Sequence, residues 1–159
     1  MPIAYLGLGS NLGDREANIR TACALLKEKG IKILKQSSII ETDPIGGPSQ
    51  GKFLNAVVKV KTQLSPHNLL AELKAIEKKL GRVKTVENGP RPIDIDILIY
   101  DNIKLTTAEL TIPHPRMLKR EFVMTPLRES YSKLAEQLIL RRRKRRSVST
   151  LSHSRRVDP

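Results

Sequence analysis

Residues 89–100 read GPRPIDIDILIY. Isoleucine fills every second position from 93 to 99, and this period of two predicts a half-buried strand. Asp94 and Asp96 are two residues apart, so their side chains leave the strand on the same face. Adjacent carboxylates repel each other, and Mg²⁺ prefers hard oxygen ligands of this kind. The stretch therefore predicts a magnesium site, with a solvated strand face that carries two acids as the alternative.

The first 100 residues predict the order strand, helix, strand, strand, helix, strand. The expected strands are 2–8, 31–41, 53–61 and 93–100. One helix follows Gly13, with Ser10 and Asn11 as good caps, and ends at Gly30. The other begins at Ser65 and Pro66 and ends at Gly81. This is the ferredoxin-like βαββαβ pattern, an α+β sandwich whose antiparallel sheet carries both helices on one face.

The open face of this sheet is expected to be unusual. The third predicted strand turns its even-numbered residues 54–60 toward the helices and leaves Phe53 and Asn55 on the other face. If the isoleucines of the fourth strand face the helices, Asp94 and Asp96 join them there. An aromatic ring, an amide and two carboxylates then share one surface. The loops 43–52 and 82–91 are long enough to close over it.

Composition limits the class of protein. The chain has 159 residues, which predicts one domain, or one domain with a tail. It holds a single cysteine, Cys23, and has no apolar run that reaches the roughly 18 residues of a membrane span. The start of the sequence does not resemble a secretion signal. We expect a soluble, cytoplasmic monomer without membrane contact.

The net charge of +13 is concentrated at the C-terminus. Residues 141–159 hold 8 basic residues and one acid, a net +7, whereas residues 1–140 hold 21 basic and 15 acidic residues, a net +6. A moderately basic body suits a phosphate-rich substrate. The tail is a block of like charge with little apolar content, which predicts disorder. It is either simply solvated or makes salt-sensitive, non-specific contact with nucleic acid or anionic surfaces.

Four blocks of sequence resemble the 6-hydroxymethyl-7,8-dihydropterin pyrophosphokinase family of folate biosynthesis. They are YLGLGSNLGD (5–14), ETDPIG (41–46) with FLNA (53–56), GPRPIDIDIL (89–98), and IPHPRM (112–117) with REF (120–122). They occur in the family's order and cover about residues 1–129. The resemblance implies a pyrophosphokinase domain at 1–129. Beyond it we expect a helical extension at 130–140 and a disordered basic tail at 141–159.

The family's activity is ATP-dependent transfer of pyrophosphate to the hydroxyl of the pterin, with release of AMP. The resemblance implies that Asp94 and Asp96 hold two Mg²⁺ ions. The residues implied to bind the ATP phosphates are Arg82, Lys84, Arg91, His114 and Arg120. Together with the two aspartates, Arg82, Lys84 and Arg91 would form the catalytic set. No dedicated general base is evident in the sequence.

The resemblance also implies a pterin-binding set. Thr42, Ile45 and Asn55 would hydrogen-bond the pterin, the first two partly through their backbone. Phe53 and Phe122, the only phenylalanines in the chain, would stack on its two faces. Aromatic stacking suits a flat heterocycle, and an amide can donate and accept at once.

Two positions depart from the family pattern. Asn88 stands where tryptophan is often found, so the loop that carries it is expected to close differently. Lys84 stands where arginine is common, which loses bidentate phosphate binding. Residues 130–159 have no counterpart in the resemblance.

Other classes of protein remain open at this point. Ferredoxin-like sheets can bind RNA through aromatic residues on the open face, but carboxylates there would repel phosphates unless a metal intervenes. A nucleotide-sugar transferase of the Asp-x-Asp type would need a second substrate domain. The Gly7-x-Gly9 turn lacks the third glycine of a dinucleotide-binding fingerprint. An inactive relative of the family is a further alternative.

The basic tail is expected to be dispensable for catalysis. A chain truncated after Leu140 should keep its pyrophosphoryl-transfer turnover, because the family blocks end before that residue. It should lose any DNA binding that the full chain shows, and such binding by the full chain should weaken at least ~10-fold between about 50 and 200 mM salt. Parallel transfer and DNA-binding assays of both chains measure this. A large loss of turnover would place the C-terminus in the working fold.

Overall fold

The computed structural model describes residues 1–83 and 86–116. It contains β1 (Ile3–Ser10), α1 (Arg15–Glu28), β2 (Lys32–Gln36), β3 (Ile40–Thr42), β4 (Phe53–Lys61), α2 (Pro66–Lys79), β5 (Asp94–Tyr100), β6 (Leu105–Thr106) and β7 (Thr111–Ile112). The predictions for Lys84, Arg120, Phe122, the helical extension at 130–140 and the tail at 141–159 lie outside the described residues.

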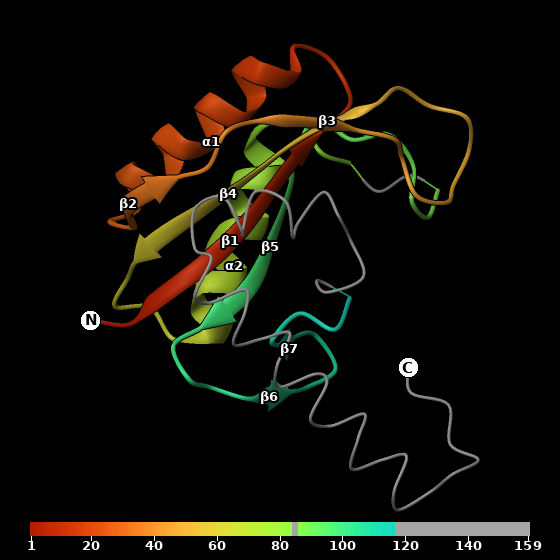
Figure 1. The fold of residues 1–159 in the computed structure, drawn as a ribbon. Coiled ribbons are helices and arrows are strands. Elements are labelled where there is room, and N and C mark those ends of the chain that lie inside the picture. Colours follow the sequence, from red (N-terminus) through yellow and green to blue (C-terminus); the bar gives the residue numbers. More distant parts are fainter. Residues whose placement is uncertain (84–85, 117–159) are drawn as a thin grey trace, which may run out of the picture.

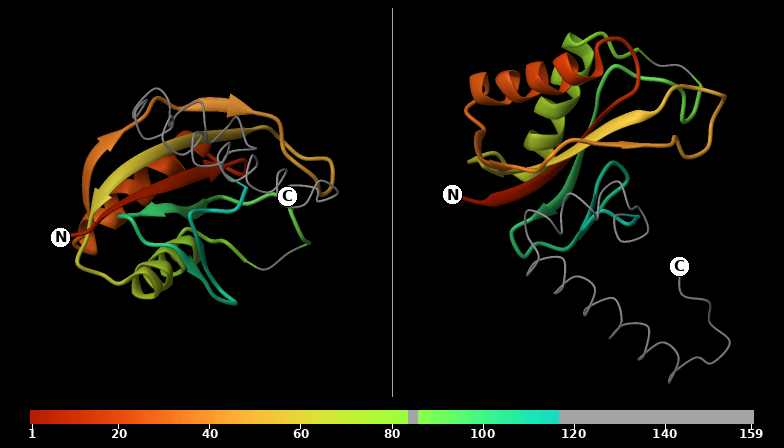
Figure 2. Two further views of the ribbon diagram at one scale, coloured as in Figure 1. Left: turned by 60° about the horizontal axis from the view of Figure 1, so that its bottom comes forward. Right: turned by 45° about the horizontal axis from the view of Figure 1, so that its top comes forward.

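The main sheet is antiparallel and has the order β2-β4-β1-β5, with β3 also paired to β4 (Figure 1). A separate hairpin joins β6 to β7. Both helices lie on one face of the main sheet (Figure 2). This confirms a mixed α/β fold with an antiparallel sheet and two helices. Within the described ranges, neither helix has the length and apolar content needed to cross a membrane.

The core lies between the helices and the sheet. It is formed by alternating residues of β1, β4 and β5 and by one stripe of each helix: Leu6, Leu8, Val58, Val60, Ile95, Ile97, Ile19, Ala22, Leu26, Leu69, Leu73 and Ile76. These residues are almost fully buried. Burial of a large aliphatic side chain stabilises a fold by about 1.5–3 kcal/mol, so this layer fixes the position of the strands that carry the site.

The helix caps match the prediction for α2 but not for α1. Ser65 Oγ accepts a hydrogen bond from the Asn68 N–H at 3.3 Å, and Pro66 follows it in the first turn. In α1 the cap is Asp14, whose Oδ1 accepts from the Ala17 N–H at 3.1 Å. The prediction that Ser10 and Asn11 cap this helix is wrong, because β1 continues to Ser10 and Asn11 holds the loops described below.

The predicted second strand, 31–41, is two strands. Ser37 separates them: its N–H donates to the Val57 carbonyl at 2.9 Å, and its Oγ accepts from the Val57 N–H at 2.8 Å. The hydroxyl thus takes a place that a backbone carbonyl would fill in a regular ladder. After this interruption the chain pairs with β4 again as β3, which sets Thr42 opposite Phe53.

A bulge in β5 corrects one prediction about the sheet faces. Leu6 pairs with Ile97 but Tyr5 pairs with Ile99, so Leu98 is an extra residue on β5. The isoleucines up to Ile97 face the helices as predicted, whereas Ile99 is not part of that core and lines a groove with Tyr5. Leu98 turns toward the pocket that contains Asp94 and Asp96.

Candidate active site

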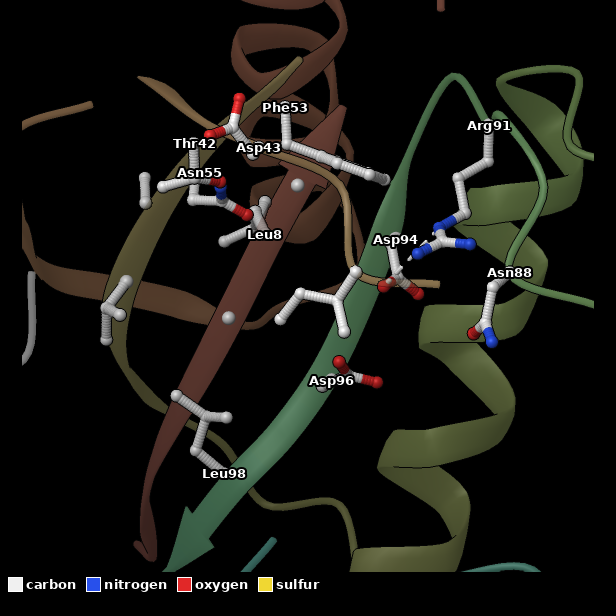
Figure 3. A pocket seen from close by; sticks show the side chains of 15 residues that line it. Leu8, Thr42, Asp43, Phe53, Asn55, Asn88, Arg91, Asp94, Asp96 and Leu98 are labelled. Carbon is white, nitrogen blue, oxygen red and sulfur yellow. Dashed lines mark hydrogen bonds and ion pairs between the residues drawn. The ribbon is translucent and has the colours of Figure 1, made fainter. Parts of the chain in front are cut away.

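One pocket on the sheet brings together seven of the predicted site residues. They come from β3, β4, β5 and the two neighbouring loops: Thr42, Ile45, Phe53, Asn55, Arg91, Asp94 and Asp96 (Figure 3). Gly7, Gly9 and Asn88 also line it. The prediction that Phe53, Asn55, Asp94 and Asp96 share one surface is confirmed, whereas the chemical roles of all seven residues stay predictions.

The two glycines of β1 form the floor of the pocket. Gly9 lies between Asn55 of β4 and Asp94 of β5, and Gly7 is the partner of Asp96. A Cβ atom added at Gly9 would stand 2.9 Å from Asn55 Oδ1, closer than such contacts normally allow. The Gly7-x-Gly9 motif therefore serves to leave space above a strand, which is a different use from the phosphate turn of a dinucleotide fold.

One side of the pocket suits a flat polar heterocycle. Asn55 Nδ2 donates to Thr42 Oγ1 at 2.6 Å, which orients a nearly buried amide. The ring of Phe53 is only 8% exposed, and the Arg91 guanidinium carbon lies 4.9 Å from its centroid. A cation held over an aromatic face in this way is favourable. Ile45, 60% exposed, places an apolar side chain at the rim.

The Asp94 carboxylate on β5 lies beside two guanidinium groups. Arg82 Nη1 donates to Asp94 Oδ1 at 2.8 Å, and Arg91 Nε lies 3.7 Å from Asp94 Oδ2. Figure 3 shows Asp94 and Asp96 side by side along β5 with Arg91 turned toward Asp94. The repulsion expected between the two acids is thus partly offset by cations of the protein itself.

Glu77 is a site residue that sequence reasoning missed. Its Oε2 accepts from Arg82 Nη1 at 2.7 Å and from the Ile95 N–H at 2.8 Å, so it orients the arginine that holds Asp94. It follows Leu73 by four residues, a position where the apolar stripe of α2 would predict a hydrophobic side chain. An acid in that stripe was the signal that could have identified it.

Burial and charge set the protonation behaviour of this cluster. Burial raises the pKa of the Glu77 carboxyl, with the Asp94 charge acting in the same direction, against the Ile95 N–H and Arg82. Burial acts to lower the pKa of Arg82, but the hydrogen bond and charge of Asp94, with the charges of Glu77 and Asp96, outweigh it and raise that pKa. Arg82 therefore stays charged in its half-buried position.

Asn11 connects the two loops that border the pocket. Its Oδ1 accepts from the Arg91 N–H at 2.8 Å, and its Nδ2 donates to Gln50 Oε1 at 2.7 Å. Gln50 Nε2 in turn donates to the Asn88 carbonyl at 2.7 Å. Asn88, the position that departs from the family pattern, has φ 56°, a left-handed conformation that asparagine tolerates. Neither Asn11 nor Gln50 was predicted as a site residue.

Asp96 is shared by the pocket and by two neighbouring hollows. One is a groove along α2 that also contains Lys74, Arg82 and Arg91, and the other is lined by Leu70, Thr107–Thr111 and His114. The backbone of His114 is fixed there, because its amide N–H donates to the Leu98 carbonyl at 2.9 Å. Arg91 and Asp94 also line both the pocket and the groove along α2, whereas Asp96 is the residue that borders all three hollows.

The aspartate pair has few protein partners for a metal ion. In residues 1–83 and 86–116, no group of three or more His, Cys, Asp or Glu side chains is arranged to hold one. Asp94 and Asp96 alone offer hard oxygen ligands of the type that Mg²⁺ takes, with substrate phosphates as the usual complement. The donor set fits a cation that arrives with a nucleotide.

Comparison with known proteins identifies the family. Residues 5–132 match the family model of 7,8-dihydro-6-hydroxymethylpterin-pyrophosphokinase. This chain belongs to that family. It is 48% identical over 128 residues to the 2-amino-4-hydroxy-6-hydroxymethyldihydropteridine pyrophosphokinase of Bacillus subtilis (strain 168). The matched segment covers 80% of this chain and 77% of that protein. The match to the corresponding Aquifex aeolicus (strain VF5) enzyme is 46% identical over 129 residues, 81% of this chain and 80% of that protein.

Longer proteins contain the same family domain. The Pisum sativum folate synthesis bifunctional protein, mitochondrial, is 48% identical over 122 residues, which is 77% of this chain but 24% of that protein. A crystal structure of wild-type Plasmodium falciparum HPPK-DHPS has a TM-score of 0.59 at 19% identity and covers 80% of this chain and 41% of its own. That similarity supports the family's fold for this chain.

Gly47 is expected to be essential for the contact between the loops. Its φ is +72°, and a Cβ atom there would overlap the Asn88 carbonyl. Gly47→Ala should therefore separate the loops and speed amide hydrogen exchange across 43–52 at least ~10-fold, equivalent to about 1.4 kcal/mol of local stability. Gly30→Ala is the control, because Gly30 has φ +75° with nothing within 4 Å of the added atom. Equal exchange of the loop in both variants would contradict this.

Proposed function

We propose that this chain transfers the pyrophosphoryl group of ATP to the hydroxyl of 6-hydroxymethyl-7,8-dihydropterin and releases AMP, a step of folate biosynthesis. The observation that carries the proposal is the position of Asp96. It borders both the pocket with the aromatic ring and paired amide and the groove with the arginines. A carboxylate at that junction lies where a heterocycle's hydroxyl and a nucleotide's phosphates would meet.

The pocket residues would recognise the pterin by shape and hydrogen bonding. Phe53 offers one ring face for stacking, and Asn55 offers an oriented amide for the polar edge. Thr42 and Ile45 would add contacts, partly through their backbone. Phe122, expected on the second face of the pterin, lies outside the described residues and stays a prediction.

The arginines would bind the phosphates of ATP. Arg91 Nε is buried and makes no hydrogen bond among the described residues, although an unsatisfied buried donor costs about 1–3 kcal/mol. A phosphate oxygen would satisfy it. Arg82 and His114 border the adjoining hollows and would contribute from there. Lys84 and Arg120 complete the predicted set but lie outside the described residues.

Asp94 and Asp96 would hold magnesium, and we propose two ions. When bound, such ions polarise an attacking hydroxyl and neutralise charge on the leaving phosphate oxygens. The chain contributes position and charge. The pterin oxygen forms a bond to the β-phosphorus as the bond from that phosphorus to the AMP oxygen breaks, and the hydroxyl proton passes to the surrounding water. Arg82 and Arg91 would stabilise charge that develops on the transferred group.

We also propose the finer architecture of this enzyme. The order β5-β1-β4-β2, antiparallel throughout, supports the ferredoxin-like topology for the pyrophosphokinase domain at 1–129. We still expect the protein to be a monomer in the cytoplasm, where ATP is available. Contact with nucleic acid is proposed only for the basic tail, because Asp94 and Asp96 occupy the sheet surface that an RNA-binding module would use.

The direct test is incubation of the protein with ATP, Mg²⁺ and 6-hydroxymethyl-7,8-dihydropterin. AMP and the pterin pyrophosphate should form in equal amounts, and neither should form when the pterin is left out. Production of ADP, or the absence of AMP with all components present, would count against the proposed function.

Removal of either aspartate should suppress the reaction. Asp94→Ala and Asp96→Ala should each lower turnover at least ~10²-fold, the effect of losing one stabiliser of a transition state. Each variant should also need more Mg²⁺ for half-maximal rate. The control is Glu16→Ala on the exposed side of α1, which should leave both quantities unchanged. Near-normal turnover in either aspartate variant would remove the metal assignment.

Phe53 should matter more for the pterin than for ATP. Phe53→Ala should weaken pterin binding by about 1–3 kcal/mol, the range for stacking of a base on an aromatic side chain. Because the Phe53 ring also packs on Arg91, a smaller loss of ATP affinity is expected. Calorimetric titration with each ligand separates the two effects. Equal losses for both ligands would indicate that the ring only supports the arginine.

A further inference from the structure

Arg15 joins the two chain segments at the base of loop 43–52. Its Nη1 donates to the Lys52 carbonyl at 2.9 Å and lies 2.9 Å from Glu41 Oε2. Glu41 belongs to β3, where the chain enters the loop, and Lys52 is the last residue before β4, where the chain returns. One guanidinium thus contacts both sides of the loop.

These two segments carry the heterocycle side of the pocket. Thr42 follows Glu41, Phe53 follows Lys52, and Thr42 and Phe53 are the last pair of the β3–β4 ladder. The next ion pair outward, from Lys52 Nζ to Asp43 Oδ1, is 3.9 Å long and exposed. Arg15 therefore sets the spacing of the segments at the point where regular pairing stops.

The position of Arg15 in α1 makes it a firm support. It is the first residue of that helix, directly after the Asp14 cap, and α1 is packed on the sheet through Ile19 and Ala22. A side chain on a buried helix is placed more accurately than one on a loop. From the preceding connection, Asn11 Nδ2 also donates to the Gly51 carbonyl at 3.1 Å. The returning segment is thus held at two successive residues.

The energetics favour a local role in geometry over a role in global stability. The Arg15 side chain is 32% exposed and that of Glu41 is 47% exposed, and ion pairs with that exposure contribute about 0–1 kcal/mol. The hydrogen bond to the Lys52 carbonyl has a charged donor and fixes a backbone position. A small loss at this point would shift Thr42 and Phe53 without unfolding the protein.

We propose that Arg15 is a positioning residue for the heterocycle side of the pocket. It is not among the residues that line the pocket, and it acts on Thr42 and Phe53 through its contacts with the Glu41 side chain and the Lys52 carbonyl. The proposal rests on the proposed function for the identity of the heterocycle. Arg15 itself makes no hydrogen bond or ion pair with Arg82, Arg91, Asp94 or Asp96 among the interactions described above; the links from this segment to Arg91 run through Asn11 and the Phe53 ring.

The test compares Arg15→Ala with Arg20→Ala. Arg20 lies on the same helix and makes an exposed ion pair with Glu16 at 3.6 Å, so its loss controls for removal of one arginine from α1. Arg15→Ala should weaken direct binding of the hydroxymethyl-dihydropterin, measured by fluorescence, about 10-fold, as groups that orient a binding residue commonly do. ATP affinity should change less than ~2-fold and the melting temperature should stay within a few degrees. Arg20→Ala should resemble the wild type in all three.

Two further variants test which part of the contact between Arg15 and Glu41 matters. Arg15→Lys keeps the charge but loses the planar fork, so it should fall between wild type and Arg15→Ala. In Glu41→Gln an acceptor remains, and the loss should be smaller than in Arg15→Ala. Pterin binding by Arg15→Ala equal to that of Arg20→Ala would overturn the proposal, as would an equal loss of ATP binding together with a large fall in melting temperature.

The proposal and the proposed function fail in different ways. If the wild type binds the pterin but forms no AMP, the proposed function is lost and the binding comparison still decides the role of Arg15. If the wild type forms AMP and Arg15→Ala binds the pterin normally, the function stands and Arg15 has no positioning role. If the wild type does not bind the pterin at all, both are overturned.

Discussion

The charge balance around Asp94 is the constraint on which the site depends. Asp94 and Asp96 are about 6–7 Å apart along the strand, and two unit charges at that spacing repel by roughly 2–3 kcal/mol at an effective dielectric of about 20. Arg82 offsets this repulsion, because its Nη1 lies 2.8 Å from Asp94 Oδ1. Glu77 in turn holds Arg82, with its Oε2 2.7 Å from the same nitrogen. With Glu77 ionised, three carboxylates and the two guanidiniums of Arg82 and Arg91 leave a net −1. A triphosphate cannot approach such a cluster favourably unless cations come with it, which is the physical case for magnesium.

The rest of the fold keeps this charge cluster beside the pocket that contains Phe53 and Asn55. Antiparallel pairing of β1 with both β4 and β5 brings Asn55 and Asp94 to the two sides of Gly9. Because Gly9 has no side chain, the Asn55 side chain can lie close over it. The Leu98 bulge ends this arrangement by adding a residue to β5 just after Asp96. Leu98 thus bounds this polar pocket with an apolar side chain.

The sequence predicted what depends on local pattern. Strict alternation identified β4 and β5, and the Ser65–Pro66 cap identified α2, because each signal lies within a few residues. Contacts between distant residues were missed. Ser37 interrupts the second strand through a hydrogen bond to Val57, and Glu77 is used by Arg82 and Ile95, yet neither partner is visible from the neighbouring sequence. The family resemblance supplied the site residues, but not the supports beneath them.

The supports differ in strength, and that difference suits a site that must admit two substrates. The floor belongs to central strands backed by a buried core, so it moves only if the domain unfolds. The rim is joined by side-chain hydrogen bonds from Asn11 and Gln50 to the two loops. Such bonds contribute about 0.5–1.5 kcal/mol each, so the rim can part at a cost of a few kcal/mol. Pocket residues on these central strands, such as Asn55 of β4, can therefore stay in place while the loops around them open.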